Sequence, residues 1–305
     1  MPDYPTSVRI VEVGARDGLQ NQPNPVPTDV KVELIDRLAA AGIRHIEAGA
    51  FVSPRWVPLM ADSADVMARI HRRSGVVYSV LTPNEKGMTQ ALATAADEVA
   101  VFLAATESFS MKNTNCSIDE AFARTEPIFA MASEHGVPVR GYISCVMGCP
   151  YAGDSTGPDR VADIAARLVS LGCHEVSLGD TIGRGNALKT ARLIERVSAR
   201  VPVEKLAAHF HNTYGQALAN LHAALQQGVA VIDSSVAGLG GCPYAKGATG
   251  NVATEDVLYM LEGMGIETGI DLSQVVDTAA WISEAIAVPI DSNTATAILA
   301  ARENP

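Results

Sequence analysis

The sequence predicts an α/β fold, a (β/α)8 TIM barrel followed by an additional C-terminal helical segment. Short apolar runs alternate with amphipathic stretches through most of the 305 residues. Eight such strand–helix units follow one another without a linker, which suits a closed parallel barrel. A doubly wound open sheet is the alternative. It is disfavoured because the turn after the first apolar run, residues 14–18, lacks the G-x-G-x-x-G spacing of a nucleotide-binding sheet.

Each element follows from its own pattern. The apolar runs predict strands at residues 8–13, 45–48, 76–81, 99–104, 139–145, 175–178, 206–211 and 231–236. Helical spacing predicts helices at residues 28–41, 61–73, 84–95, 118–135, 158–171, 186–200, 216–227 and 254–264. A further helix at 273–287 is expected to pack on the barrel, and 289–305 to form a loose tail. The expected organisation is a catalytic barrel domain, residues 1–270, and a C-terminal helix and tail, residues 271–305.

Composition narrows the class of protein. The net charge of −11 disfavours a nucleic-acid partner, which requires a basic face, but leaves room for an anionic substrate at a locally basic mouth. No apolar run approaches the roughly 20 residues that a membrane span requires, so we expect no membrane partner. The five cysteines are an odd number, and the first expected strand leaves no room for a leader. We therefore expect a reduced, cytoplasmic protein.

Polar residues gather where the expected strands end, which is the face that carries the active site in barrels of this kind. Taken singly, each can have a structural explanation: an Asp can cap a turn, and a buried Glu47 can take Arg140 as its salt-bridge partner. Their convergence on one mouth favours a functional site instead. The residues at or near these ends are Arg16, Asp17, Glu47, Arg140, Tyr142, Asp180, Thr181, His209, His211, Ser235 and Asn251.

The motif His209-Phe210-His211 indicates half of a metal site. Side chains alternate along a strand, so the two imidazoles point the same way and Phe210 points the other. The carboxylate of Asp17 and the amide of Asn251 complete a ligand set that suits Mg²⁺ or Mn²⁺. Zinc is possible with two histidines but is less favoured without a thiolate ligand. No lysine stands clearly at a strand end, so Schiff-base chemistry is disfavoured and a Lewis-acid metal is expected.

Cys242 lies in a loop rich in glycine. Glycines at 238, 240, 241, 247 and 250 favour a mobile loop. A thiol there can exchange protons near neutral pH if its surroundings tune it. From composition alone, an incidental loop cysteine is the more common case.

Five segments together resemble the 3-hydroxy-3-methylglutaryl-CoA lyase family, within the superfamily of metal-dependent lyase and condensing-enzyme barrels. The resemblance runs from residue 8 to about residue 269. Residues 234–244, followed by Gly250-Asn251, are the most specific part, and their Gly-Gly-Cys-Pro-Tyr piece marks the lyase branch. The segments are 11–21 (VEVGARDGLQN), 51–58 (FVSPRWVP), 177–183 (SLGDTIG), 209–216 (HFHNTYGQ) and 234–244 (SSVAGLGGCPY).

The resemblance implies a reaction and a role for each site residue. The implied reaction is cleavage of 3-hydroxy-3-methylglutaryl-CoA to acetyl-CoA and acetoacetate through an enolate that Arg16 stabilises. Cys242 would transfer a proton, Glu47 would support Arg16, and Asp180 would be an acid–base or hydrogen-bonding group. The implied ligands of Mg²⁺ or Mn²⁺, of which Asp17 and His209 also count as catalytic, are Asp17, His209, His211 and Asn251. The implied substrate contacts are Arg16, Gln20, Arg140 and Tyr142.

The resemblance also implies a homodimer and a place in leucine degradation. Three alternatives stay open at this point. The same motifs serve a lyase for a bulkier 3-hydroxy-3-alkylglutaryl-CoA. A transferase that condenses acetyl-CoA with a 2-oxo acid is disfavoured by Cys242. A metal-binding barrel without activity is disfavoured by the combination of Arg16 and Cys242.

Overall fold

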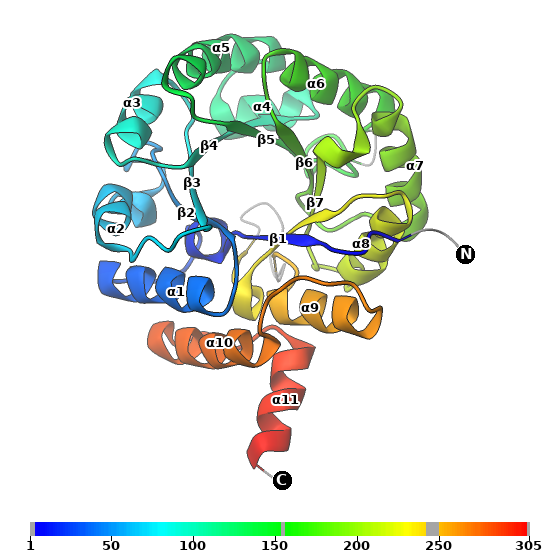
Figure 1. The fold of residues 1–305 in the computed structure, drawn as a ribbon. Coiled ribbons are helices and arrows are strands. Elements are labelled where there is room, and N and C mark those ends of the chain that lie inside the picture. The colour runs from blue at the N-terminus through cyan, green and yellow to red at the C-terminus, as the bar shows by residue number, and fades with distance from the viewer. Residues whose placement is uncertain (1–3, 154–155, 242–249, 304–305) are drawn as a thin grey trace.

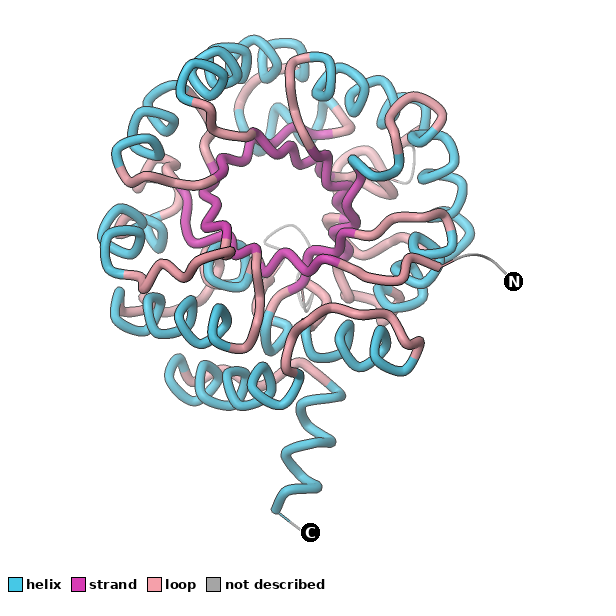
Figure 2. The backbone as a smooth tube through the Cα atoms, viewed as in Figure 1, coloured by secondary structure: helices cyan, strands magenta, loops and turns pink. Residues whose placement is uncertain are grey.

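The computed structural model describes residues 4–153, 156–241 and 250–303. Eight parallel strands form a closed barrel in which each pairs with the next and β8 pairs with β1 (Figures 1 and 2). The predicted fold class is confirmed. The strands are β1 Arg9–Glu12, β2 His45–Ala50, β3 Val77–Leu81, β4 Glu98–Ala104, β5 Val139–Ser144, β6 Glu175–Asp180, β7 Leu206–Phe210 and β8 Val231–Ser234.

Helices form a ring outside the strands (Figure 1). The ring follows from right-handed strand–helix–strand crossovers, which return each strand parallel to the one before. The helices are α1 Thr28–Ala40, α2 Ser63–Arg69, α3 Glu85–Ala93, α4 Glu107–Thr114, α5 Ile118–His135, α6 Pro158–Ser170, α7 Ala187–Ser198, α8 Ala217–Gln226, α9 Thr254–Gly263, α10 Leu272–Ile286 and α11 Asn293–Glu303. Single helical turns are η1 Gly14–Gly18, η2 Pro58–Met60, η3 Val203–Lys205 and η4 Val236–Gly238.

Strand β5 shows how the barrel separates its apolar core from its polar interior. A Cβ on Gly141 would lie 3.0 Å from Leu168 of α6, so Gly141 faces the helices. Ile143, two positions further along the strand, faces the same way. Ile143 is completely buried there in the main apolar cluster. Arg140 and Tyr142 point the opposite way, into the barrel, where both are also buried. The barrel interior therefore carries buried polar groups that continue down from the mouth.

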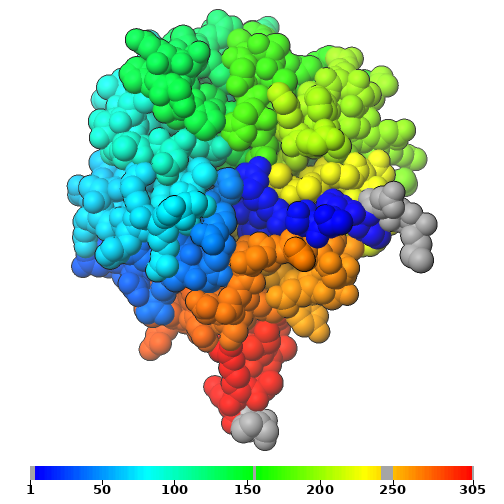
Figure 3. Space-filling view, in the orientation of Figure 1, coloured from blue at the N-terminus to red at the C-terminus, as the bar shows by residue number. Residues whose placement is uncertain are grey.

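The C-terminal end differs from the prediction. The expected loose tail contains α11, which protrudes from the barrel beside α10 (Figures 1 and 3). Ser292 starts this helix, because its hydroxyl donates to Asp256 Oδ1 at 2.9 Å and accepts from the Ala295 amide at 3.0 Å. The tail prediction was wrong because a serine cap, not apolar periodicity, fixes this helix. The helix α4, capped by Thr106, likewise lies between residues 104 and 118, where no helix was predicted.

The helix α10 packs on the barrel near α1, where the Arg37 guanidinium lies 4.5 Å from the Trp281 ring centroid. The division into a domain of residues 1–270 and a segment of 271–305 stays a prediction.

No described helix combines the length and the apolar character needed to cross a bilayer. Within the described residues, the cysteines 116, 145, 149 and 173 are buried, and Cys116, Cys149 and Cys173 form no disulfide there.

Candidate metal centre and active site

The end of β1 folds into the tight turn η1, which carries Arg16 and Asp17. The carbonyl oxygen of Val13 accepts from the amides of Arg16, Asp17 and Gly18, at 3.2, 2.7 and 3.1 Å. Such π-type turns are rare in proteins, and those that occur are frequently found at functional sites. A Cβ on Gly14 would stand 2.6 Å from Glu12 Oε1, so this position requires glycine. The turn therefore brings both side chains to the mouth of the barrel directly after the strand.

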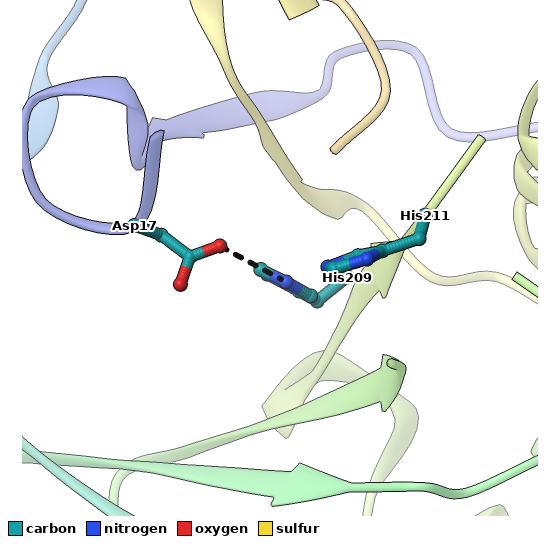
Figure 4. Close-up of side chains that lie close together, drawn as sticks. All are labelled: Asp17, His209 and His211. Carbon is teal, nitrogen blue, oxygen red and sulfur yellow. Dashed lines mark ion pairs between the residues drawn. The ribbon is translucent and has the colours of Figure 1, made fainter. Parts of the chain in front are cut away.

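Asp17, His209 and His211 lie together at this mouth (Figure 4). One ligand-type atom from each residue lies within 4.8 Å of the others. His209 Nε2 is 4.0 Å from Asp17 Oδ2, and the two histidine rings lie side by side with centroids 5.4 Å apart. The strand β7 carries His209, and His211 follows its end. The convergence predicted for these three residues is thus present in the structure.

Asn251 reaches the same place from the segment before α9. It forms an isolated antiparallel bridge with His211, and its Nδ2 donates to Asp17 Oδ2 over 2.8 Å. A metal ligand role requires the amide oxygen, which a half-turn of the amide group presents in place of the nitrogen. Asn251 therefore stands next to the cluster, with the nitrogen turned toward Asp17 in this structure.

The donor set fits a divalent cation. Two ligands that each lie about 2.1 Å from one ion are separated by roughly 3 to 4.2 Å, which covers the 4.0 Å between His209 Nε2 and Asp17 Oδ2. His211 Nδ1 is buried and makes no hydrogen bond within the described residues. Burial, reinforced by His209, lowers the pKa of His211 to about 4, so this imidazole is neutral and has a free lone pair.

Asp17 is ionised although it is largely buried. Burial alone would raise its pKa, but the Arg16 guanidinium and the two neighbouring histidines outweigh this and lower the pKa to about 2. Its Oδ1 accepts from Arg16 Nη1 at 2.7 Å and from Gln20 Nε2 at 2.8 Å. Gln20, predicted to contact substrate, thus orients Asp17 here. A charged carboxylate held from two sides is a pre-organised cation ligand.

Arg16 is held as a buried cation between two carboxylates. Its Nε and Nη2 donate to Glu47 Oε2 at 2.7 and 2.6 Å, opposite the bond to Asp17. Burial opposes the charge of Arg16, but Glu47 and Asp17 overcome this and raise its pKa further. Burial also raises the pKa of Glu47, with Arg16 acting against that rise. The predicted support of Arg16 by Glu47 is a direct contact in the structure.

Tyr142 and Arg140 lie deeper in the barrel. The Tyr142 ring meets the Arg140 guanidinium at 4.9 Å and that of Arg16 at 5.8 Å, and it contacts His209 edge-on. Arg140 donates Nε to Glu175 and both terminal nitrogens to Asp233. Arg140, predicted to contact substrate, is 1% exposed and paired with these carboxylates. Its predicted substrate contact stays a prediction.

Asp180 ends β6 and is completely buried. Its two carboxylate oxygens accept the backbone amides of Arg184 and Gly185, at 3.1 and 2.8 Å. Burial raises the pKa of Asp180 to about 6, although these two amides pull it down. A carboxyl group with a pKa near the working pH is suited to give and take protons.

Two buried glutamates support the site, and the sequence analysis missed both. Glu12 Oε1 accepts the amides of Gly14 and Val236, at 2.8 and 2.9 Å, and so ties η1 to the loop after β8. Glu255 accepts the Ala237 amide at 2.9 Å, where the backbone has a positive φ of 58°. Glu12 is a charged residue inside the apolar strand predicted at residues 8–13, and this was the available signal. Cys242 lies outside the described residues.

A scan against protein-family models matches residues 7–282 to the model described as HMGL-like. The chain belongs to the HMGL-like family. This confirms the family resemblance predicted from the sequence. One HMGL-like relative is the Pseudomonas aeruginosa protein named 3-hydroxy-3-isohexenylglutaryl-CoA/hydroxy-methylglutaryl-CoA lyase. It is 57% identical over 298 residues, which cover 98% of this chain and 99% of the relative.

Solved HMGL-like structures agree with this assignment. A crystal structure of hydroxymethylglutaryl-CoA lyase from Pseudomonas aeruginosa superposes with a TM-score of 0.96 at 56% identity, covering 98% of this chain and 99% of that one. An HMG-CoA lyase from Acinetobacter baumannii in complex with coenzyme A and 3-methylmalate has a TM-score of 0.92 at 34% identity, with 97% of both chains covered.

Proposed function

We propose that this protein is a metal-dependent carbon–carbon lyase that cleaves 3-hydroxy-3-methylglutaryl-CoA to acetyl-CoA and acetoacetate. The observation that supports this proposal best is the cluster of Asp17, His209 and His211 with the buried Arg16 beside it. The predicted lyase activity is confirmed by the full-length relatives, which are named as lyases for this substrate. The transferase and the inactive metal-binding barrel are therefore set aside.

The chain's own groups can perform the proposed cleavage. A bound divalent cation supplies Lewis-acid polarisation of substrate oxygen atoms. A general base takes the proton of the C3 hydroxyl, and that oxygen becomes the ketone of acetoacetate as the bond between C2 and C3 breaks. The electron pair of this bond moves onto the thioester oxygen, where Arg16 is a fixed cation for the negative charge, and C2 of the enolate then takes a proton to give acetyl-CoA. Glu47 holds Arg16 in place, so the guanidinium need not reorganise during the reaction. Asp180, with its pKa raised to about 6, can hold or release a proton near neutral pH.

The other assignments are proposals of the same kind. Cys242 transfers a proton between solvent and the reacting carbon or oxygen atoms. Gln20, Arg140 and Tyr142 contact the substrate. For Gln20 this is supported by its bond to Asp17, and for Tyr142 by its place beside the Arg16 guanidinium. The ion is Mg²⁺ or Mn²⁺, since oxygen ligands outnumber nitrogen ligands once substrate oxygens join Asp17 and Asn251.

The oligomeric state, the cellular location and the metabolic role of the protein are also proposals. We infer a homodimer, a cytoplasmic location and a role in leucine degradation. The location is supported by Cys116, Cys149 and Cys173, which form no disulfide within the described part of the chain, since a reduced compartment keeps thiols from pairing. The domain division at residue 270 is supported by α10 and α11, which follow the last barrel helix.

A bulkier substrate is the second candidate, because the 57% identical Pseudomonas aeruginosa relative is named for both 3-hydroxy-3-isohexenylglutaryl-CoA and the methyl compound. The two differ only in the substituent on C3, so the same catalytic groups serve both. Comparing kcat/KM on the two thioesters decides between them. Equal or better turnover of the isohexenyl compound would contradict a narrow specificity.

The test of the main proposal uses chelator-treated protein. Acetoacetate release from 3-hydroxy-3-methylglutaryl-CoA is measured with and without added Mg²⁺ or Mn²⁺. We expect release only with metal. Turnover that is unchanged after metal removal would contradict the metal-dependent mechanism, and no release with metal present would contradict the substrate.

A further inference from the structure

Asp233 lies in the barrel interior, one layer below the metal cluster. It belongs to β8, its side chain is completely buried, and it pairs in register with His209 of β7. Its Oδ2 is 3.2 Å from His209 Nδ1, on the opposite side of that ring from Asp17. One imidazole therefore has an aspartate facing each of its two nitrogens.

The other partners of Asp233 show that it is a carboxylate. Arg140 donates Nη2 to Oδ1 at 2.6 Å and Nη1 to Oδ2 at 3.1 Å, and Ser177 donates its hydroxyl to Oδ2 at 2.7 Å. A two-point pair with a buried guanidinium requires the ionised form, because a carboxylic acid would turn a proton toward a cation. An ionised carboxylate only accepts hydrogen bonds. The hydrogen in the contact with His209 must therefore sit on Nδ1.

We propose that Asp233 is a positioning residue that fixes His209 as the tautomer protonated on Nδ1, so that the lone pair of Nε2 faces Asp17 and the metal. This inference rests on the metal site proposed above. Histidines that bind metals commonly donate their second ring nitrogen to a carboxylate, which fixes the ring and raises its basicity. Here Arg140 and Ser177 hold the carboxylate in turn, so the support extends from the barrel interior to the cluster.

Glu175 provides a matched control. Like Asp233 it is a buried carboxylate in the barrel interior and pairs with Arg140, through Nε at 2.7 Å. Its other partner is Arg9, and no contact joins it to His209 in the described part of the chain. Replacing either carboxylate by its amide removes one negative charge next to Arg140. Only Asp233→Asn also changes the carboxylate that accepts the hydrogen bond from His209 Nδ1.

The first measurement is Mn²⁺ affinity, read from the electron paramagnetic resonance signal of free Mn²⁺. We expect one site per chain in the native protein. Asp233→Asn should weaken binding by about 10–100-fold, the usual effect of losing such a support. Glu175→Gln should stay within about threefold of the native protein, well short of that range. Equal losses in both variants would overturn the proposal, because they would indicate a general effect of charge removal.

The second measurement reads the tautomer directly in the native protein and does not require Asp233→Asn to fold. Long-range proton–nitrogen spectra of metal-free, ¹⁵N-labelled protein in alkaline buffer distinguish Nδ1–H from Nε2–H, and His209→Gln identifies the signals. We expect Nδ1–H in the native protein and a shift toward Nε2–H in Asp233→Asn, as amide replacement does in catalytic triads. Nε2–H in the native protein would overturn the inference. Native protein that binds no Mn²⁺ would instead overturn the metal site, whichever tautomer is found.

Discussion

Asn251 donates its side-chain amide to Asp17 across 2.8 Å, although 234 positions of sequence separate the two residues. The contact is possible because β1 pairs with β8, which brings the first and last segments of the barrel together. The candidate metal site is thus assembled by barrel closure, and its ligands have no common local sequence motif except His209 and His211.

Loss of Asp17 should remove most metal affinity. We expect Asp17→Ala to weaken Mn²⁺ binding by more than about tenfold, since losing even a residue that supports a ligand costs about 10–100-fold. Calorimetry measures the affinity. Asp65→Ala, an exposed acidic residue on α2, is the control and should bind normally. Native affinity in Asp17→Ala would refute its assignment as a ligand.

Arg16→Gln should impair the chemical step. The variant keeps a polar group but loses the fixed cation, and removing one such stabilising donor costs about 10²–10³ in kcat. Steady-state kinetics with saturating metal measures kcat and KM separately. A change confined to KM would show that Arg16 binds the ground state and does not stabilise the enolate.

Cys242→Ala should lower kcat by about 10²–10⁴, the contribution of a general acid–base group, while metal affinity is retained. Cys116→Ala removes a buried cysteine whose thiol contacts Thr114, and it is the control. A loss below roughly threefold, small against the acid–base range, would assign Cys242 a structural role.

The stability of the fold should decrease as pH rises from about 5 to 9. Burial raises the pKa of Glu255 from 4.5 to about 8 and that of Glu12 to about 7. Between the unfolded and folded pKa values the folded state binds more protons, so its stability is full below the lower value and is lost as pH rises through the higher one. Thermal unfolding across this window measures the loss.

Glu255→Gln checks the cause of this pH dependence. Its amide oxygen can still accept from the Ala237 amide but no longer titrates. Across this pH window, we expect the thermal unfolding midpoint of Glu255→Gln to change by several degrees less than the midpoint of the native protein. A slope equal to the native one would assign the pH dependence to other groups.

Gly14→Ala should destabilise the protein by about 1–3 kcal/mol, the usual cost of overpacking, since a Cβ there would stand 2.6 Å from Glu12 Oε1. Gly263→Ala is the control. It lies in α9 with nothing within 4 Å of the added Cβ, and we expect it to stabilise by about 0.5–1 kcal/mol. Chemical denaturation compares the two, and equal effects would contradict the requirement for glycine in η1.

The fold could be predicted because eight apolar runs in regular alternation with helices leave few other topologies. Two short helices were missed for a local reason. The helix α4 has only two buried residues, Phe109 and Ser110, and α11 has only Ala295, so neither shows an apolar stripe. Their caps, Thr106 and Ser292, were the better signals.

The mouth of the barrel could be predicted, but its supporting layer could not. Asp17, His209 and His211 stand at strand ends, where position alone marks them. Asp233 and Glu12 belong to the strands themselves, and whether such a residue faces the interior or the helices depends on strand register. One sequence does not fix that register, so their contacts with His209 and η1 emerged only from the structure.

Barrel closure also sets when the site can exist during synthesis. Asp17 leaves the ribosome early, whereas Asn251 and the strand that seals the barrel leave it near the end. A nascent chain that has already exposed His209 still lacks Asn251, part of the proposed ligand set. Truncated translation products that stop before β8 therefore cannot assemble the complete cation site, and only a nearly finished polypeptide acquires it.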